Sequence, residues 1–370
     1  MRVRELTLEY FRNYPHGHAQ FHPGMNIICG DNAQGKTNLL EAIEYLATAH
    51  SPRCLTEREL ILFGVDDAFL TGEVDARGRS FTMEMQLSNR RRRSIHVNGV
   101  RIQKQSELAD YLNVVTFRPE DLYLIRAGAE DRRRFLDDTI TQLRPRYADA
   151  LNRYQEARSQ KAAILRRLDE CPSMLETLDD FSVQMCRYGA QVIHYRAHYI
   201  RRLNEIVPPI HREFSQGKET LELEYLTEKY DISDTLRPAK ELYESLLAAM
   251  ETHRDSEIAS RRCLVGPHRD DFGVRINGQN ARYLASQGQT RTAALSLKIA
   301  QRDIIYEERE EYPVLLLDDV LSELDPRRQE FVLNRIQGGQ VFLTCCEEER
   351  LAELVDGKIF RVTEGSIAEE

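Results

Sequence analysis

Apolar residues group along this chain in two ways, as short continuous runs and at helical spacing. The run at 25–29 predicts a strand, and the segment after it, 36–47, places Leu39, Ile43 and Leu46 on one helical face. A second run at 313–319 reads Pro-Val-Leu-Leu-Leu-Asp-Asp. A strand with no polar residue is typical of a parallel sheet covered on both faces. The pattern therefore predicts an α/β fold.

The middle of the chain has a different character. Residues 116–262 contain only three glycines, and helical spacing dominates. We expect helices at 147–168, 175–206 and 239–250, a strand at 221–226, and a break at Pro208–Pro209. This predicts a helical second lobe at 116–262, inserted between two halves of one domain at 1–115 and 263–370.

Composition narrows the class of protein only a little. A chain of 370 residues is long enough for two domains or for one with an insertion. No apolar run approaches the length of a membrane span and the first residues lack a signal-peptide core, so we expect a cytoplasmic protein with no membrane partner. The net charge of −9 does not by itself indicate nucleic-acid binding.

The first chemical motif lies between the strand at 25–29 and the helix at 36–47. Two glycines with a following lysine and threonine, at the spacing Gly30…Gly35-Lys36-Thr37, match a P-loop at a strand-to-helix turn. Such a loop curls its N–H groups toward phosphate, and the helix N-terminus adds partial positive charge. We expect ATP with Mg²⁺, Lys36 on the phosphates and Thr37 on the metal. The other nucleotide-binding residues predicted here are Asp31, Asn32, Ala33, Gln34 and Asn38.

Two carboxylates follow the second apolar run. In parallel sheets ligands bind at the carboxyl ends of the strands. Asp318 is therefore placed to hold Mg²⁺, and Asp319 to orient or polarise the attacking water. An alternative is that one of the two acids caps the helical segment that begins at Leu321. That alternative accounts for one acid and not for both.

A second glycine-containing segment opens a long helical stretch at 292–306. It reads Ser286-Gln287-Gly288-Gln289, and we call it the signature segment. Ser286 is a suitable N-cap residue, and Gly288 lets another phosphate approach the helix start. The chain thus carries two phosphate-binding helix starts that are far apart in sequence.

The order of these motifs resembles an ABC-type ATPase head. It comprises a Walker A motif at 30–37, a signature at 286–289, a Walker B motif at 314–319 and a D-loop at 322–325. Further stretches make the chain similar over nearly its whole length to the RecF family of bacterial recombination mediators, which is related to SMC heads. These stretches are 11–14, 117–122, 132–137 and 266–271.

The resemblance implies a mechanism. In such heads ATP lies between the P-loop of one subunit and the signature of another, so Ser286, Gly288 and Gln289 would act in trans and ATP would drive formation of a homodimer. Duplex DNA at gaps or junctions would lie across the closed dimer, and RecR/RecO-type mediator proteins would be partners in recombinase loading. Arg12 and Asn13 would contact the nucleotide.

Two positions depart from the ABC pattern. The second Walker B acid is Asp319 where those heads usually have Glu, and the strand at 341–343 ends in Thr344 where they carry a histidine. Both changes favour a slow hydrolytic timer, with turnover below about 1 s⁻¹. The main alternative, the nucleotide-binding subunit of an ABC transporter, would need that histidine. An SMC-like clamp would need long heptad arms, and a kinase would leave the signature segment without a role.

Two arginine-rich stretches are candidate DNA contacts. Arg90–Arg93 lie at the tip of an expected hairpin, and 187–202 combines four arginines with histidines and tyrosines but has no acid. The alternatives are a solvated loop for the first and ion pairs with distant acids for the second. For 132–134 local ion pairs are the preferred interpretation.

Overall fold

A computed structural model describes residues 1–170, 172–230, 237–345 and 357–369. The chain divides into two compact units. Unit 1 comprises Met1–Leu122 and Lys298–Glu370, and unit 2 comprises Tyr123–Leu297. The two units are described separately below.

A mainly parallel sheet in unit 1 places the nucleotide-binding motifs at one edge. Its strand order is β15-β14-β3-β13-β12-β8, and only β15 runs antiparallel to its neighbour. The strands predicted from the runs at 25–29 and 313–319 are confirmed as β3 and β12, and every residue of β12 is buried. The carboxyl ends of neighbouring parallel strands share an edge of the sheet. The bounds are β3 Met25–Cys29, β8 Val114–Phe117, β12 Val314–Leu317, β13 Val341–Cys345, β14 Gly357–Thr363 and β15 Ser366–Glu369.

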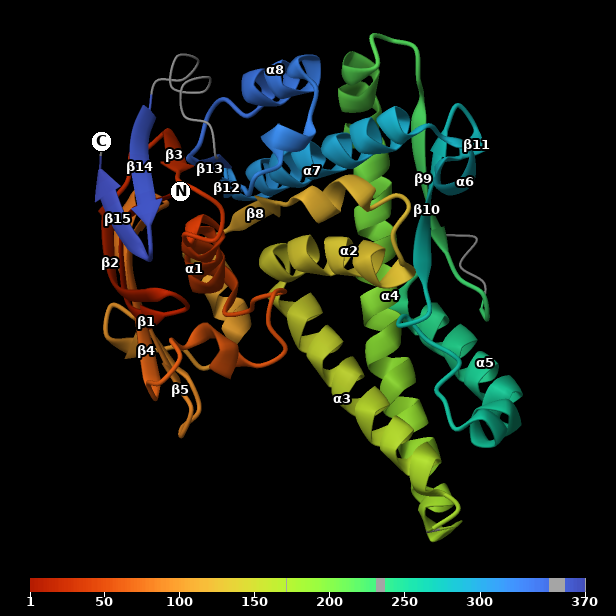
Figure 1. Ribbon diagram of the computed structural model, residues 1–370. Helices are drawn as coiled ribbons and strands as arrows, with labels where there is room; N and C mark the ends of the chain where they lie inside the picture. The colour runs from red at the N-terminus through yellow and green to blue at the C-terminus, as the bar shows by residue number, and fades with distance from the viewer. Residues whose placement is uncertain (171, 231–236, 346–356, 370) are drawn as a thin grey trace. The chain divides into compact units, whose positions relative to one another are not determined.

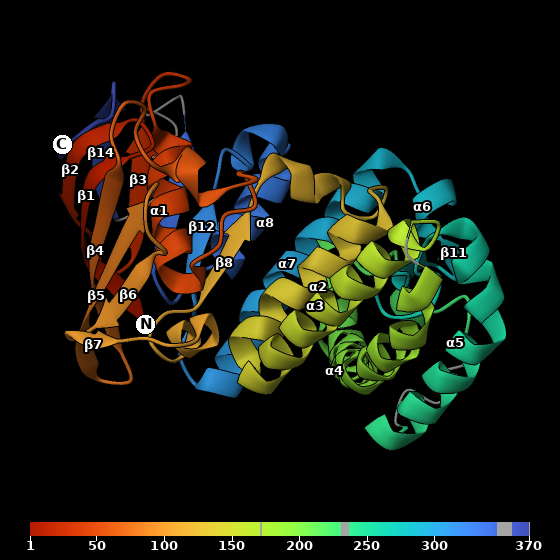
Figure 2. The ribbon, with the colours of Figure 1, turned by 90° about the horizontal axis from the view of Figure 1, so that it is seen from below.

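An antiparallel sheet of order β2-β1-β4-β5-β6-β7 completes unit 1. Helix α1 (Lys36–Thr48) lies between the two sheets, as Figure 2 shows, and its Leu39, Ile43 and Leu46 are fully buried there. The helix predicted at 36–47 is thus confirmed. The other elements of unit 1 are β1 Arg2–Phe11, β2 Tyr14–Gln20, β4 Asp67–Ala76, β5 Arg79–Ser88, β6 Ser94–Val97, β7 Val100–Arg101, η1 Glu57–Leu60, η2 Gln105–Asp110, η5 Leu321–Glu323 and α8 Pro326–Arg335. The short helix η3 (Pro119–Tyr123) ends at the boundary with unit 2.

Unit 2 is mainly helical, as predicted for the middle of the chain, and α3 and α4 run side by side in it (Figure 1). A small sheet of order β11-β10-β9 packs against α2 and α4. No helix among the described residues is long and apolar enough to cross a membrane. The elements are α2 Ala129–Leu143, α3 Pro145–Arg167, η4 Pro172–Met174, α4 Leu175–Phe214, β9 Leu221–Leu226, α5 Ala239–Ser260, β10 Asp271–Ile276, β11 Gln279–Asn280 and α6 Ala281–Leu284. Helix α7 (Gln287–Arg309) begins in unit 2 and ends in unit 1.

The helix break predicted at Pro208–Pro209 is wrong. Helix α4 continues through both prolines to Phe214. Proline removes one backbone donor, which usually bends or ends a helix. Here the last turns are held by packing, because Val207, Ile210 and His211 are almost completely buried.

The compact units differ from the predicted division at 263–297. Strand β10 pairs along its whole length with β9, from Asp271 opposite Leu226 to Ile276 opposite Leu221. This pairing groups the segment with unit 2, whereas the sequence pattern assigned 263–370 to the second half of the head. The boundaries 1–115, 116–262 and 263–370 therefore stay a prediction.

Candidate nucleotide site

The P-loop, residues 30–37, connects β3 to α1 and depends on two glycines. Gly30 and Gly35 have φ angles of 146° and 119°, which residues with a Cβ rarely adopt. A Cβ at Gly30 would lie 2.4 Å from the carbonyl oxygen of Val362, and one at Gly35 would lie 2.7 Å from Nδ2 of Asn13. The backbone can follow this path only because neither position carries a side chain.

Lys36 lies inside the curl of the loop. Its Nζ donates hydrogen bonds to the carbonyl oxygens of Gly30 at 2.6 Å and Asp31 at 2.9 Å, and the residue is 7% exposed. The first turn of α1 contains no acidic residue, so no carboxylate of that turn offsets the partial positive charge of the helix N-terminus. The ammonium group and the helix start together form a site suited to an anion.

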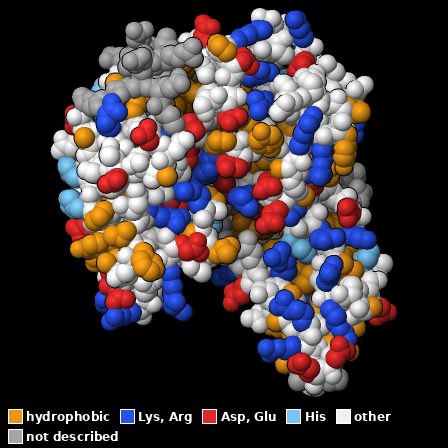
Figure 3. Space-filling view, viewed as in Figure 1, with side chains coloured by type: hydrophobic (Ala, Val, Ile, Leu, Met, Phe, Trp, Pro, Cys, Tyr) orange, Lys and Arg blue, Asp and Glu red, His pale blue; other side chains and the backbone are white. Residues whose placement is uncertain are grey.

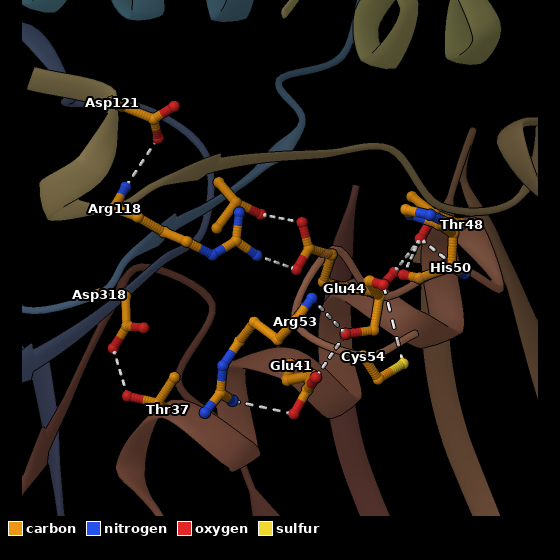
Figure 4. A network of polar contacts seen from close by, with 12 residues as sticks. Thr37, Glu41, Glu44, Thr48, His50, Arg53, Cys54, Arg118, Asp121 and Asp318 are labelled. Carbon is orange, nitrogen blue, oxygen red and sulfur yellow. Dashed lines mark hydrogen bonds and ion pairs between the residues drawn. The ribbon is translucent and has the colours of Figure 1, made fainter. Parts of the chain in front are cut away.

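Thr37 and Asp318 meet at the same edge of the sheet, although 281 positions separate them. The Thr37 hydroxyl donates to Oδ1 of Asp318 at 2.9 Å (Figure 4), and Asp318 is 7% exposed. A hydroxyl and a carboxylate are the hard oxygen donors that Mg²⁺ prefers. No group of three or more His, Cys, Asp or Glu residues in the described part of the chain could hold a metal. The pair therefore fits Mg²⁺, which Thr37 and Asp318 would hold through their oxygens.

Asp319 has a strained backbone. Its φ of 51° lies in the left-handed region, which costs a non-glycine residue on the order of 1–2 kcal/mol. Its N–H donates to the Thr344 hydroxyl at 2.8 Å, and the same hydroxyl donates to Oδ1 of Asp318 at 3.0 Å. Thr344 thus fixes both acids. From the sequence, Thr344 is noted only because ABC-type heads carry a histidine there, and its contacts with the two acids are not predicted.

Arg12 is close to α1 but is bound to protein groups. Its guanidinium forms two hydrogen bonds with Glu41, at 2.9 and 2.7 Å, and a third with the carbonyl of Glu59. Burial acts to raise the pKa of Glu41, but hydrogen bonds from Arg12 and Ser51 and the charge of Arg53 outweigh it and leave that pKa lowered. The Arg12 guanidinium thus contacts Glu41 of α1 and the backbone of Glu59. Its predicted contact with the nucleotide stays a prediction.

Asn13 supports the P-loop from outside. Its Nδ2 donates to the carbonyl of Gln34 at 2.8 Å, and its Oδ1 accepts from Nδ2 of Asn38 at 2.9 Å. Asn38 in turn accepts a hydrogen bond from Arg53 at 2.9 Å. Asn13 therefore links the last part of the loop to the first turn of α1.

The turn between β14 and β15 is a support that the sequence did not reveal. The N–H of Gly365 donates to the carbonyl of Gln34 at 3.1 Å, and the N–H of Glu364 donates to Oε1 of Gln34 at 2.6 Å. A Cβ at Gly365 would lie 2.0 Å from the carbonyl oxygen of Asn13. Glu-Gly is ordinary turn chemistry, so only the fold shows what this turn touches.

The motif at 117–122 is bound to α1 and α7. Arg118 pairs with Glu44 of α1, which also accepts from the Thr116 hydroxyl at 2.9 Å (Figure 4). Burial raises the pKa of Glu44, although the charge of Arg118 acts against it. Lys298 donates to the carbonyl of Thr116 at 2.8 Å and pairs with Asp121 at 3.2 Å. These contacts join β8 to α1 and to the end of α7 that lies in unit 1.

The signature segment lies in unit 2 at the start of α7. Ser286 and Gln289 exchange two hydrogen bonds, in which the Gln289 N–H donates to the Ser286 hydroxyl at 3.2 Å and the Ser286 N–H donates to Oε1 of Gln289 at 2.8 Å. Ser286 is exposed, as are the neighbouring apolar residues Tyr283 and Leu284, at 73% and 66%. The segment is a formed helix start at the protein surface.

The remaining motifs are mostly structural. Arg132 forms two hydrogen bonds of 2.7 Å with Asp271, which joins the stretches 132–137 and 266–271. Arg134 pairs with Asp131 at 3.5 Å, in line with the local ion pair expected there. Arg196 is 3% exposed and bound to Asp137, and Tyr199 is also buried. Because they are buried, Arg196 and Tyr199 do not line a DNA-facing surface, and that part of the prediction for 187–202 is wrong.

The loop at 90–93 keeps three of its arginines, Arg90, Arg91 and Arg92, exposed. Arg90 pairs with Asp66 at 2.5 Å, and Arg93 pairs with Glu57, whereas Arg91 and Arg92 have no ion pair among the described residues. Lys and Arg side chains also gather in the lower right of Figure 3, where α3, α4 and α5 lie in the same view of Figure 1. There Arg153 and Arg187 lie over the Tyr188 ring, at 5.5 and 5.8 Å from its centroid.

Comparison with known proteins identifies the family. The model of the RecF/RecN/SMC N terminal domain matches residues 2–367. The DNA replication and repair protein RecF of Bacillus mycoides (strain KBAB4) is 39% identical, with 99% of this chain and 98% of that protein covered. The chain belongs to the RecF family. Its counterpart from Bacillus cereus (strain B4264) is 38% identical over the same share.

Solved structures agree with this assignment. A structure of the recombination mediator protein RecF-ATPrS in the RecFOR pathway superposes with a TM-score of 0.92 at 32% identity, and covers 100% of this chain and 98% of that chain. An SMC head bound to the C-winged helix domain of ScpA superposes with a TM-score of 0.57 at 16% identity, over 100% of this chain and 97% of that one. The fold of this RecF-family chain is thus that of an SMC-like ATPase head, as predicted.

Proposed function

We propose that this chain is an ATP-dependent DNA-binding switch of recombinational repair. The observation that carries the proposal is the meeting of Lys36, Thr37 and Asp318 around one P-loop in a RecF-family fold. Relatives solved with ATP and with ATPrS carry the same fold at 32% identity, which supports ATP as the ligand. Thr37 and Asp318 would hold Mg²⁺, which would offset the charge of the phosphate groups.

The residues of unit 1 would then act as follows. Lys36 exchanges the carbonyl oxygens of Gly30 and Asp31 for phosphate oxygens. Thr37 and Asp318 hold Mg²⁺, and Asp319 orients the attacking water from its strained turn. Turnover is slow, below about 1 s⁻¹, because Asp319 is one methylene shorter than glutamate and Thr344 cannot take up a proton.

ATP drives dimerisation in this proposal. The signature segment is exposed in unit 2 and flanked by the exposed apolar residues Tyr283 and Leu284, a combination that suits a surface covered by a second copy. Ser286, Gly288 and Gln289 then bind the γ-phosphate of the partner's nucleotide in trans. Duplex DNA at gaps binds to the closed dimer, and mediator proteins of the RecR/RecO type, as in the RecFOR pathway, are its partners.

Sedimentation tests the proposal directly. We expect the wild-type chain to dimerise when ATP and Mg²⁺ are added, and to shift duplex DNA only in that state. A Lys36→Ala variant should stay monomeric and leave the DNA unshifted. A protein that shifts duplex DNA equally with and without ATP would contradict the switch.

A further inference from the structure

A series of hydrogen-bonded polar groups, buried or partly buried, lies behind the signature segment, entirely within unit 2. Nε2 of Gln289 donates to Oε1 of Glu219 at 2.9 Å. The other oxygen of Glu219 lies 3.0 Å from Nε2 of His211. Nδ1 of His211 lies 3.3 Å from the hydroxyl of Ser296, two turns further along α7. These polar contacts therefore connect the start of α7 to its third turn through Glu219 and through His211 of α4.

The side chain of Gln289 has one permitted orientation in this arrangement. Its Oε1 accepts from the N–H of Ser286 at 2.8 Å, and its Nε2 donates to the Glu219 carboxylate. Rotation of the amide by half a turn would place two acceptors and two donors face to face. Glu219 thereby fixes Gln289, and Gln289 fixes the backbone of Ser286 by the reciprocal exchange typical of a capping box.

His211 holds Glu219 in place. The ring is fully buried, whereas the Glu219 side chain is 18% exposed. Burial lowers the pKa of His211, although Glu219 acts in the opposite direction. A carboxylate only accepts, so Nε2 of the ring donates to Glu219, while the Ser296 hydroxyl beside Nδ1 donates to the carbonyl of Thr292 at 2.9 Å. A fully buried imidazole in this position needs both partners, because an unpaired polar group there would destabilise the fold.

We propose that Glu219, held by His211, is the positioning residue of the signature segment. It sets Gln289, and through it Ser286 and the backbone of the first turn of α7, in the geometry that binds phosphate. The inference rests on the proposed function, in which that phosphate belongs to the nucleotide of a second copy. Glu219 acts through Gln289 and does not touch the nucleotide.

A charge swap separates positioning from simple structural support. In Gln289→Glu two carboxylates face each other, so we expect the ATP-dependent dimer to weaken at least tenfold. In the double variant Gln289→Glu with Glu219→Gln, the amide now at position 219 donates to the carboxylate now at position 289 and accepts from His211. We expect the double variant to recover dimerisation to within about threefold of wild type. A double variant no better than Gln289→Glu would overturn the proposal.

Removal of the carboxylate gives a second readout. Glu219→Ala should weaken ATP-dependent dimerisation at least tenfold, whereas Glu219→Gln should retain it, because His211 can donate from Nδ1 to Ser296 and accept at Nε2. Both variants should bind ATP as monomers within twofold of wild type, since the P-loop lies in unit 1. Unchanged dimerisation of Glu219→Ala would overturn the proposal, while loss of ATP binding would show a folding defect and overturn it too.

Mixing experiments show in which subunit Glu219 acts. A heterodimer of Lys36→Ala and Glu219→Ala contains one site with an intact P-loop and an intact signature segment. We expect the mixture to regain ATP hydrolysis that neither variant shows alone. No recovery would place the effect of Glu219 on its own P-loop and overturn the inference. A wild-type chain that never dimerises with ATP would overturn the proposed function itself, a result that is visible before any variant is made.

Discussion

Two helices of this protein begin at segments suited to phosphate, and the surrounding chain supports them in opposite ways. The start of α1 is enclosed, with Lys36 at 7% exposure and glycines that touch Val362 and Asn13. The start of α7 is open, with Ser286 at the surface and its support concentrated in one chain of polar groups. We call the P-loop and the start of α1, residues 30–37, the cradle, because it surrounds its binding site. The start of α7 supplies only one side of such a site.

In the proposed function, this difference lets one chain bind a nucleotide and still respond to it. A complete cradle holds the ligand in a single copy, whereas an exposed half contributes only when another surface is brought to it. Four substitutions in the nucleotide site of unit 1 test this difference, in order from the largest expected effect to the smallest. Each should leave the signature segment of unit 2 unchanged.

Removal of the cradle's charge should have the largest effect. Lys36→Ala removes the ammonium that faces the phosphates, and we expect ATP affinity to fall about a hundredfold or more. Equilibrium binding of a fluorescent ATP analogue measures this. Lys240→Ala, which removes an exposed lysine of unit 2, is the control and should bind as wild type.

A side chain added inside the P-loop should have the second largest effect. Gly30→Ala combines a φ of 146° with a Cβ 2.4 Å from a backbone oxygen, so we expect a loss of about 2–4 kcal/mol in the free energy of unfolding and weak ATP binding. Gly278→Ala is the matched control, since its φ is 76° but nothing lies within 4 Å. It should lose only about 1 kcal/mol. Urea titration of both variants gives the comparison, and equal losses would mean that the contact with Val362 is not restrictive.

The outer support should have a smaller effect on binding. Gly365→Ala places a Cβ 2.0 Å from the carbonyl of Asn13 and displaces the turn that bonds to Gln34, so ATP affinity should fall about tenfold. Gly78→Ala, at another hairpin turn with φ 68° and open space, should bind ATP as wild type. Wild-type affinity in Gly365→Ala would show that the loop keeps its shape without this turn.

The smallest change expected concerns hydrolysis alone. Thr344→Val removes the hydroxyl that bonds to Asp318 and Asp319 while it keeps the side-chain shape, so phosphate release should slow about fivefold to tenfold with ATP affinity nearly unchanged. Thr344→Ser should restore the rate. Steady-state phosphate assays decide, and a Val variant as fast as wild type would remove Thr344 from the arrangement of the acids.

The sequence predicted the elements of the cradle but not its supports. The runs at 25–29 and 314–317 and the spacing of Leu39, Ile43 and Leu46 report burial that each segment carries by itself. The contacts of Gln34 with Asn13 and Gly365 depend on where β2 and β15 place their turns, and no local pattern encodes that. The break predicted at Pro208 failed for the same reason, since packing outweighed a local preference.

The polar residues that support the signature segment could not be predicted from the sequence either. His211 and Glu219 stand next to prolines, glycine and lysine in a stretch without periodicity, so nothing marked them as partners of Gln289. Only the path of α4 and the loop before β9 brings them beneath α7. Distant residues that support a motif are thus the part of a site that a single sequence conceals.

The turn at Glu364 and Gly365 ties nucleotide binding to the progress of translation. A ribosome completes residues 30–37 long before it reaches this turn, some 330 positions later. Until then Gln34 lacks two of its backbone partners and β3 lacks β14 as a neighbour. A nascent or prematurely terminated polypeptide would therefore display the motif without the contacts that hold Gln34 in place, and so without the ability to retain ATP tightly.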